Sequence, residues 1–257
     1  MNIYIFADME GISGVSGSDF VRLDGLFYQD GRRFYTMDIN VCIDACFKAG
    51  ADAVIVRDGH GSGNNLIWSE LDPRAEVIQG NSGTKRFPEI KGCSALILLG
   101  YHAMAGTMNA LLEHTYSSTS IQNMWLNGER VGEFAIDSTI ATEYGIPTIM
   151  VSGDDKVCEE AKNWIPEIVT CQVKTSLTCQ GARLLSMETA HRLIRAKTIE
   201  AIENINQIKA PVINKPVKLK KEYVERYQIH TGNDVKIIDG HTIEITSNSL
   251  VEALLIG

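Results

Sequence analysis

The sequence predicts an α/β protein in which helices cover both faces of a mostly parallel β-sheet, so that the domain has three layers. Short apolar runs without polar alternation recur between residues 3 and 151, as in strands that are buried on both faces. Helical patterns lie between them, and strands that alternate with helices build a parallel sheet. The length of 257 residues and a hydrophobic content of 44% are sufficient for such a core.

Each predicted strand is a short run of apolar and β-branched residues that ends in polar, glycine-containing sequence. The four runs are Ile3–Ala7, Ala53–Val56, Ala95–Leu99 and Thr148–Val151. Because parallel strands share a direction, the polar residues that follow these runs meet at one edge of the sheet.

The predicted helices carry recognisable start and stop signals. They are Phe34–Ala49, Glu133–Tyr144, Asp154–Trp164 and one long amphipathic helix, Ser186–Ile208. Gly50 and Gly145 follow the first two and suit helix C-termini. Asp154 and Ser186 are suitable N-caps for the last two.

The pattern changes after Pro211, where Val212–Leu219 and Val235–Thr246 are typical of strands and Asp239-Gly240 of a hairpin turn. We therefore expect an α/β domain over residues 1–170, which contains all the strand ends described above. Residues 171–257 form a smaller α+β portion, which can pack with the first domain as one unit.

Composition narrows the function. A formal net charge of −8 argues against nucleic-acid binding, which needs clustered Lys and Arg. No apolar run approaches the ~20 residues of a membrane helix, and the N-terminus shows no signal peptide, so we expect a cytoplasmic protein without membrane association.

Six cysteines in a long, leaderless chain favour reduced thiols over a disulfide framework. Cys42 and Cys46 lie four residues apart on one helix face. A metal pair there is conceivable, but buried small apolar side chains are the more common use of such cysteines.

Chemically versatile residues gather at the predicted strand ends. Asp8 and Glu10 follow the first strand, Asp58 and His60 the second, and His102 the third. Alone, each is typical of a solvated loop or a hydrogen-bonded core histidine. Ligands in open α/β sheets bind beyond the carboxyl ends of the strands, so the combination indicates a metal site. Imidazole and carboxylate together suit zinc, whereas an all-oxygen set suits magnesium or calcium.

The number of candidate ligands indicates two zinc ions per chain. One catalytic zinc uses three protein ligands, and the candidates exceed that need. If Asp8 bridges, the charges of Asp8, Glu10 and Glu133 with one hydroxide balance two Zn²⁺. Direct ligation by Asp58 would exceed the balance, so we place Asp58 behind the ligands, where it can hold a ligand imidazole in its tautomer.

Several segments together resemble the zinc-dependent D-aminopeptidases of the dipeptide-transport-operon type (DppA-like). They are A-D-M-E-G-I-S-G (Ala7–Gly14), D-G-H-G (Asp58–Gly61), L-G-Y-H-A (Leu99–Ala103), the later His114, V-G-E (Val131–Glu133) and V-S-G-D-D (Val151–Asp155). The resemblance extends to about residue 207 and is weaker beyond it.

The resemblance implies a role for each ligand. Asp8 matches the residue that bridges both zinc ions. Glu10 and His102 match the other ligands of one zinc, and His60 and Glu133 match those of the second. Asp58 matches no direct ligand, in agreement with the charge argument.

The resemblance also implies an activity and an assembly. The expected reaction is hydrolysis of the N-terminal peptide bond of short peptides that begin with a D-residue. The expected assembly is a homodecamer whose active sites face an internal channel. His114 matches the catalytic histidine, which acts either as the nucleophile or, as we prefer on physical grounds, as a proton shuttle or oxyanion stabiliser.

The sequence departs from the family pattern in three places. Glu113 stands where a small polar residue is expected before His114, and the interval from His102 to His114 is one residue longer. The chain ends soon after Leu255, so we expect no final helix.

Two other functions stay open at this point. A dinuclear phosphoesterase, or another amidohydrolase, would use the same metal arrangement, although a phosphoesterase needs basic groups that the sequence does not place near the motifs. A non-catalytic protein whose metal stabilises the fold or an assembly is the third.

Overall fold

The computed structural model describes residues 1–226 and 229–256. Its centre is a six-stranded sheet in the order β3-β2-β1-β4-β7-β8, with every neighbouring pair parallel. The strands are β1 (Asn2–Ala7), β2 (Ala53–Asp58), β3 (Glu76–Ile78), β4 (Ala95–Tyr101), β7 (Thr148–Gly153) and β8 (Val169–Gln172). The predicted parallel sheet is confirmed, and each of the four predicted strands is present.

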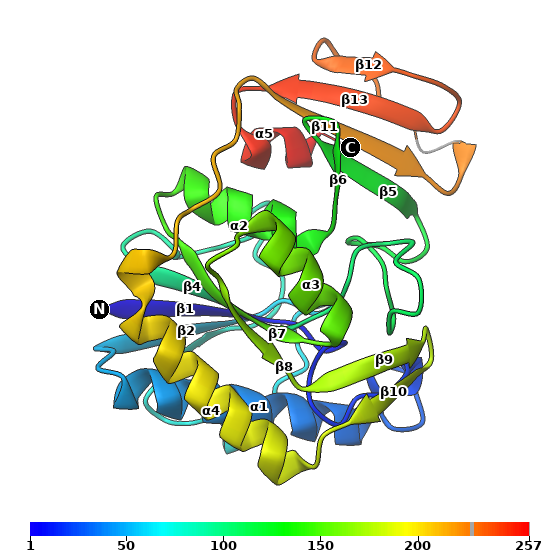
Figure 1. Cartoon of the computed structure of the whole chain (residues 1–257). Helices are drawn as coiled ribbons and strands as arrows, with labels where there is room; N and C mark the ends of the chain where they lie inside the picture. The colour runs from blue at the N-terminus through cyan, green and yellow to red at the C-terminus, as the bar shows by residue number, and fades with distance from the viewer. Residues whose placement is uncertain (227–228, 257) are drawn as a thin grey trace.

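Helices cover both faces of this sheet and complete the three layers (Figure 1). They are α1 (Tyr28–Lys48), α2 (Glu133–Glu143), α3 (Asp155–Trp164) and α4 (Met187–Glu203). Helices α1 and α4 pack together on one face, and α2 and α3 on the other. The predicted N-caps are confirmed, since Asp154 accepts a hydrogen bond from the Val157 amide and Ser186 one from the Thr189 amide.

Two helix boundaries differ from the prediction. Helix α1 begins at Tyr28, six residues before the predicted start, because the polar residues of this stretch hide the helical pattern. Within the stretch, Gly31 packs directly against the Phe20 carbonyl. Helix α4 ends at Glu203, and a separate 3-10 turn, Ile205–Gln207, follows it.

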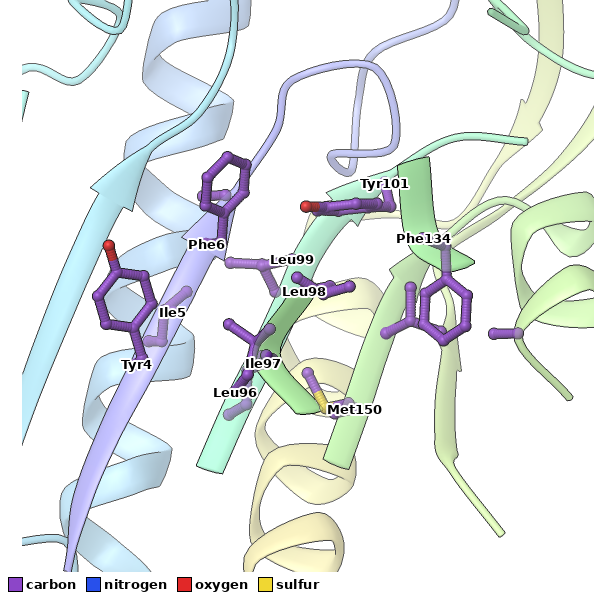
Figure 2. Close-up of a cluster of buried hydrophobic side chains, with 14 of the residues drawn as sticks. Tyr4, Ile5, Phe6, Leu96, Ile97, Leu98, Leu99, Tyr101, Phe134 and Met150 are labelled. Carbon is purple, nitrogen blue, oxygen red and sulfur yellow. The ribbon is translucent and has the colours of Figure 1, made fainter. Parts of the chain in front are cut away.

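The central strands are buried on both faces, which explains their lack of alternation. Every residue of β4 is buried, and so are Ile3–Ala7 of β1. Their side chains pack with Phe134 and Met150 between the helical layers (Figure 2). Cys42 and Cys46 lie buried in α1, and all six cysteines are free, as predicted.

A second, antiparallel sheet stands beside the parallel one (Figure 1) and has the order β12-β13-β11-β5-β6. Its strands are β5 (Ile121–Leu126), β6 (Glu129–Val131), β11 (Val217–Tyr223), β12 (Val235–Ile237) and β13 (Thr242–Ser247). It therefore combines strands from both sides of residue 170, while the domain division itself stays a prediction. A separate hairpin pairs β9 (Lys174–Thr178) with β10 (Gly181–Leu184).

The C-terminal elements match the prediction in part. The turn at Asp239-Gly240 joins β12 to β13 as predicted. Strand β11 begins later than predicted, after Pro216, which has no amide to donate to a ladder. The expectation that no final helix is present is wrong, because α5 spans Leu250–Leu255. Ser249 is its N-cap, and the Ser249 side chain accepts a hydrogen bond from the Glu252 amide.

No helix among residues 1–226 and 229–256 combines the length and the apolar character that crossing a membrane requires.

The strand order places a topological switch point between β1 and β4. From β1 the chain runs through β2 to β3 on one side, and from β4 through β7 to β8 on the other. Connections that diverge in this way leave a crevice at the carboxyl ends of the two strands, where ligands of open α/β sheets bind.

Two glycines let the loops behind β1 and β4 meet in this crevice. The Gly11 amide donates to the Gly100 carbonyl at 2.7 Å. A Cβ on Gly11 would stand 2.0 Å from the Tyr101 carbonyl oxygen. Gly100 has a φ of +75°, and a Cβ there would stand 2.2 Å from the Asp8 carbonyl oxygen. Neither position can accept a side chain without moving backbone.

We predict that Gly100→Ala destabilises the protein more than Gly50→Ala does. Gly50 has a φ of +89° but open space around it, so alanine there meets only the left-handed backbone cost of about 1–2 kcal/mol. Alanine at Gly100 adds a clash with backbone worth about 1–3 kcal/mol more. Denaturant unfolding of both variants measures the difference, and equal losses would contradict the close contact.

Candidate metal centre

The five predicted ligands come together at the switch-point crevice. Asp8 and Glu10 follow β1, His60 follows β2, His102 follows β4, and Glu133 is the first residue of α2. A cavity of about 590 Å³ is lined by four of them, Asp8, Glu10, His60 and Glu133, while His102 is buried behind its wall. The three carboxylates are each no more than 6% exposed, so the crevice concentrates negative charge in a poorly solvated place.

Asp8, Glu10 and His60 form one group of possible metal ligands. His60 Nδ1 lies 3.0 Å from Asp8 Oδ1 and 3.0 Å from Glu10 Oε2. His60 Nε2 lies 2.9 Å from the Val21 carbonyl, which accepts its proton and leaves a lone pair on Nδ1. Glu10 Oε2 is buried and makes no hydrogen bond, so this oxygen lacks the partner that burial demands.

His102, His114 and Glu133 form the second group. His102 Nε2 lies 3.4 Å from Glu133 Oε1 and 3.5 Å from Asp8 Oδ2. His102 Nδ1 lies 3.0 Å from the Ala103 carbonyl, so its proton is held there and Nε2 carries the lone pair. His102 Nε2 is also buried without a hydrogen bond. Both groups thus contain an orphaned ligand atom.

The carboxylate of Asp8 lies between the two groups. Its Oδ1 faces His60 and its Oδ2 faces His102. Ligands of one tetrahedral zinc lie about 3.3 Å apart, since each bond is ~2.0 Å long. These distances therefore favour Glu10 with His60 and Glu133 with His102. The resemblance implied the other division, in which Glu10 joins His102 and His60 joins Glu133.

The electrostatics of the crevice favour positive charge. Burial alone lowers the pKa of His102, but the adjacent carboxylates of Asp8 and Glu133 outweigh it and raise that pKa well above the usual range. Burial likewise lowers the pKa of His60, and the charge of Glu10 with the hydrogen bond to Asp8 raises it further than burial lowers it. Divalent cations supply such charge, and a mixed imidazole–carboxylate set fits zinc.

The carboxylates respond in the opposite sense. Burial raises the pKa of Glu133, but the adjacent imidazole of His102 dominates and brings it to about 2. Burial raises the pKa of Asp8, but the adjacent imidazoles of His102 and His60 outweigh it and hold that pKa well below the usual range. Both side chains are therefore ionised and available as ligands at neutral pH.

His114 reaches the second group from the long loop between β4 and β5. Its Nε2 lies 3.6 Å from Glu133 Oε1, and its ring stacks on His102 with centroids 4.0 Å apart. Its Nδ1 lies 2.9 Å from the Leu112 carbonyl, which leaves Nε2 free to accept a proton. The structure thus brings the predicted catalytic histidine to the ligands.

The loop that carries His114 is strained. Asn109, Leu112 and Tyr116 all have positive φ, between 50° and 60°. Residues other than glycine rarely adopt this conformation, and such strain persists only where surrounding contacts impose it. Two contacts do so here: the Leu112 amide donates to the Cys179 carbonyl, and the Tyr116 amide to Glu133 Oε1.

Sequence reasoning missed a group of side chains that holds Glu133. Arg86 Nη2 lies 3.1 Å from Glu133 Oε2 and 2.7 Å from Asp137 Oδ2. Tyr101 and Tyr116 donate their hydroxyl protons to the same Asp137 carboxylate. Asp137 follows Glu133 by one helical turn, a spacing that places both carboxylates on the same face of the helix and could have been recognised in the sequence. Arg86 lies in an irregular loop and gave none, so the expectation of no basic group near the motifs is wrong.

Lys174 of β9 is a second residue that the sequence did not reveal. Its buried Nζ donates to the carbonyls of Glu10 at 2.9 Å and Val15 at 2.7 Å. Burial lowers its pKa to about 7. It fixes the loop behind Glu10, and a single lysine in a short strand carries no signal of such a role.

Asp58 lies behind the ligands, in contact with neither group. Its Oδ2 accepts from the amides of Asn65 at 2.6 Å and Leu66 at 3.2 Å. Asn65 also donates from Nδ2 to the His60 carbonyl. Asp58 therefore shapes the backbone around His60. The expectation that it holds the imidazole is wrong, since the Val21 carbonyl does so.

Comparisons with known proteins agree over the whole fold. The model of the Peptidase_M55 family, described as D-aminopeptidase, matches residues 1–256. A curated D-aminopeptidase of Bacillus subtilis (strain 168) is 34% identical over 213 residues, 81% of this chain and 76% of that protein. A solved structure, the Zn-dependent D-aminopeptidase DppA from Bacillus subtilis, a self-compartmentalizing protease, matches with a TM-score of 0.94 at 29% identity. That match covers 100% of this chain and 95% of the other.

We predict that Asp58→Asn weakens zinc binding without removing a zinc site. The new amide nitrogen would face the Asn65 and Leu66 amides, at a cost of about 1–3 kcal/mol in stability. Affinity for zinc should fall about 10- to 100-fold, as for other residues behind a ligand. Zinc content at saturation should equal that of the unaltered protein, whereas His60→Ala should lose zinc. One zinc fewer in Asp58→Asn would make Asp58 a ligand.

Proposed function

Because the chain belongs to the Peptidase_M55 family of D-aminopeptidases, we propose that it is a zinc-dependent hydrolase that removes an N-terminal D-residue from short peptides. The observation that carries this proposal is the pair of ligand groups that meet at Asp8 in one cavity. The D-preference comes from the family, since the geometry of the cavity does not select a hand.

We propose two zinc ions per chain. Asp8 would bridge them, with Glu10 and His60 on one side and His102 and Glu133 on the other. The orphaned atoms Glu10 Oε2 and His102 Nε2 support one ion in each group. When bound, paired zinc ions polarise the scissile carbonyl and lower the pKa of water towards ~7.

The chain's own groups then position the reactants and move the proton. His114 Nε2, with its lone pair directed at the ligands, takes the proton from the attacking water and passes it to the leaving amine. Arg86 and the Tyr116 amide hold Glu133 from two directions, so the ligand keeps its orientation.

The lining of the cavity favours a peptide over a phosphate ester. Glu113 adds a fourth carboxylate to Asp8, Glu10 and Glu133, and the basic residues of the lining are Arg22 and Arg86. Arg86 is already paired with two carboxylates. With Asp8, Glu10 and Glu133 holding zinc, Glu113 is the lining carboxylate that remains, and it would attract a cationic N-terminus and repel a phosphate dianion.

We predict that His114→Ala lowers kcat about 10²- to 10⁴-fold on D-Ala p-nitroanilide and leaves two zinc ions per chain. His241→Ala, in the distant β12–β13 turn, is the matched control and should leave both quantities unchanged. Elemental analysis and initial rates give the two measurements. L-Ala p-nitroanilide and p-nitrophenyl phosphate should be poor substrates for the unaltered protein.

Three outcomes would contradict this function. Fewer than two zinc ions after reconstitution would reject the dinuclear site. Preferred cleavage of the phosphate ester would replace the peptidase by a phosphoesterase. An acyl group trapped on His114 would make this residue the nucleophile and not the proton carrier.

We further propose that the chain self-associates into a homodecamer around an enclosed space. Exposed large apolar side chains support an interface near the cavity mouth: Leu23 is 75%, Leu26 80% and Met108 82% exposed. They lie next to Arg22 and on the loop of His114, both of which border the cavity. Exposed apolar clusters of this kind commonly mark contacts between subunits.

We predict that Leu26→Glu combined with Met108→Glu lowers the assembly size. A charge placed in an apolar contact loses its hydration without gaining a partner. Light scattering should give ten times the chain mass of 28.3 kDa for the unaltered protein and a smaller mass for the double variant. Val212→Glu, which is 93% exposed on the linker before β11, should keep the full size. A monomeric unaltered protein would contradict the proposal.

A further inference from the structure

We propose that a second cavity, next to the metal cavity, binds the free carboxylate at the C-terminal end of a short peptide substrate. The enzyme would then select di- and tripeptides with a free C-terminus over amides of the same peptides. This inference rests on the proposed peptidase function and names the part of the substrate that the metal ligands do not contact.

The second cavity has a volume of about 630 Å³ and lies between the two sheets. Phe6 of β1 lines one side, and Met124 of β5 and Leu254 of α5 line the other. Gly59, Gly61, Arg86 and Tyr116 line both this cavity and the metal cavity. The two spaces are therefore neighbours, and a peptide held by its N-terminus in one can extend into the other.

The two cavities differ in charge. The metal cavity has four carboxylates in its lining: Asp8, Glu10 and Glu133 would hold zinc, and Glu113 would remain to attract an ammonium group. The second cavity has Arg57, Lys85, Arg86 and Lys221, and no Asp or Glu among the described residues that line it. This contrast stands out in a chain with a net charge of −8. A short peptide at neutral pH carries an ammonium at one end and a carboxylate at the other, so its charges match the pair of cavities.

Two of the four cations, Arg57 and Lys221, are held by hydrogen bonds to the surrounding protein. Arg57 is 9% exposed and donates to the Gly80 carbonyl at 2.8 Å and to Ser82 Oγ at 3.3 Å. It has no acidic partner in residues 1–226 and 229–256, so its charge is available to the cavity while its hydrogen bonds fix the loop of residues 80–85. Lys221 donates to the carbonyls of Leu254 and Ile256, which gives it a structural role.

Lys85 and Arg86 are the groups placed to contact a carboxylate. Lys85 is exposed at the cavity, and its ammonium forms no ion pair with the part of the chain that is described. Arg86 uses Nε and Nη2 for Asp137 and Glu133, while Nη1 makes no hydrogen bond to any described residue. Because Arg86 is already paired with two carboxylates, its Nη1 would orient the substrate carboxylate through a hydrogen bond. Lys85 would supply the positive charge that is not yet paired.

The length of a short peptide agrees with the position of Lys85 and Arg86 at the second cavity. Arg86 Nη2 lies 3.1 Å from Glu133 Oε2, so one guanidinium borders both cavities. Each extended residue spans at most ~3.5 Å, so the carboxylate of a di- or tripeptide lies within roughly 7 Å of the scissile bond. Longer peptides would place their terminal carboxylate beyond this loop.

The test uses the complete zinc-loaded enzyme and three substrates: D-Ala-D-Ala, its C-terminal amide and D-Ala p-nitroanilide. The unaltered enzyme should show a kcat/KM for the free acid about tenfold above that for the amide. Lys85→Gln should reduce this ratio about three- to fivefold, as expected for one partly exposed ion pair. Lys85→Glu should reverse the preference. Both variants should hydrolyse the anilide, which has no carboxylate, at the unaltered rate.

Lys91→Glu makes the same charge change on an exposed residue outside both cavities and is the matched control. It should keep the ratio of the unaltered enzyme. Equal kcat/KM for acid and amide in the unaltered enzyme, or an unchanged ratio in Lys85→Glu, would overturn the inference and leave the peptidase function standing. Failure to hydrolyse any of the three substrates would overturn the proposed function and the inference with it.

Discussion

The contact between the backbones behind β1 and β4 is the constraint on which the site depends. Gly11 and Gly100 let the two loops meet without side chains, directly at the switch point of the sheet. This contact holds Asp8 where its two oxygens face histidines from different strands. A Cβ at either glycine would separate the loops and move one histidine away from the shared carboxylate. The position of Asp8 between two histidines is thus a consequence of strand order and of two glycines.

The same closeness creates an electrostatic demand. Three carboxylates that are nearly buried would repel one another in a poorly solvated crevice. The raised pKa of His60 and His102 and the lowered pKa of Asp8 and Glu133 show how strongly positive charge is stabilised there. Each imidazole gives one proton to a backbone carbonyl, so in the neutral form the nitrogen that faces the carboxylates has the lone pair that a metal ion would need. Neutral imidazoles do not balance the charge of the three carboxylates, and metal ions would supply the positive charge that is needed.

The sequence predicted the parallel sheet and the meeting of the candidate ligands at its edge, because both follow from local pattern. Apolar runs mark buried strands, and the residues directly behind them are placed by the sheet itself, as for Asp8 and His102. It could not predict contacts that join distant, irregular segments. Arg86 reaches Glu133 from a loop without periodicity, and Lys174 reaches the Glu10 carbonyl across 164 positions. The final helix was missed because its six residues are stabilised by packing and by Glu143, not by length.

The antiparallel sheet helps to position the side chains of the site. Strand β5 follows the loop of His114, and β6 ends one residue before Gly132, the N-cap of the helix that Glu133 begins. In the sequence, the loop of His114 and the start of α2 both lie between β4 and β7 of the parallel sheet. Their position relative to Asp8 therefore depends on how the second sheet packs. Helix α5 fixes that packing, since its first amides donate to Glu143 at the end of α2. The C-terminal strands, although far from the motifs in sequence, therefore help to set the distance between His114 and Glu133.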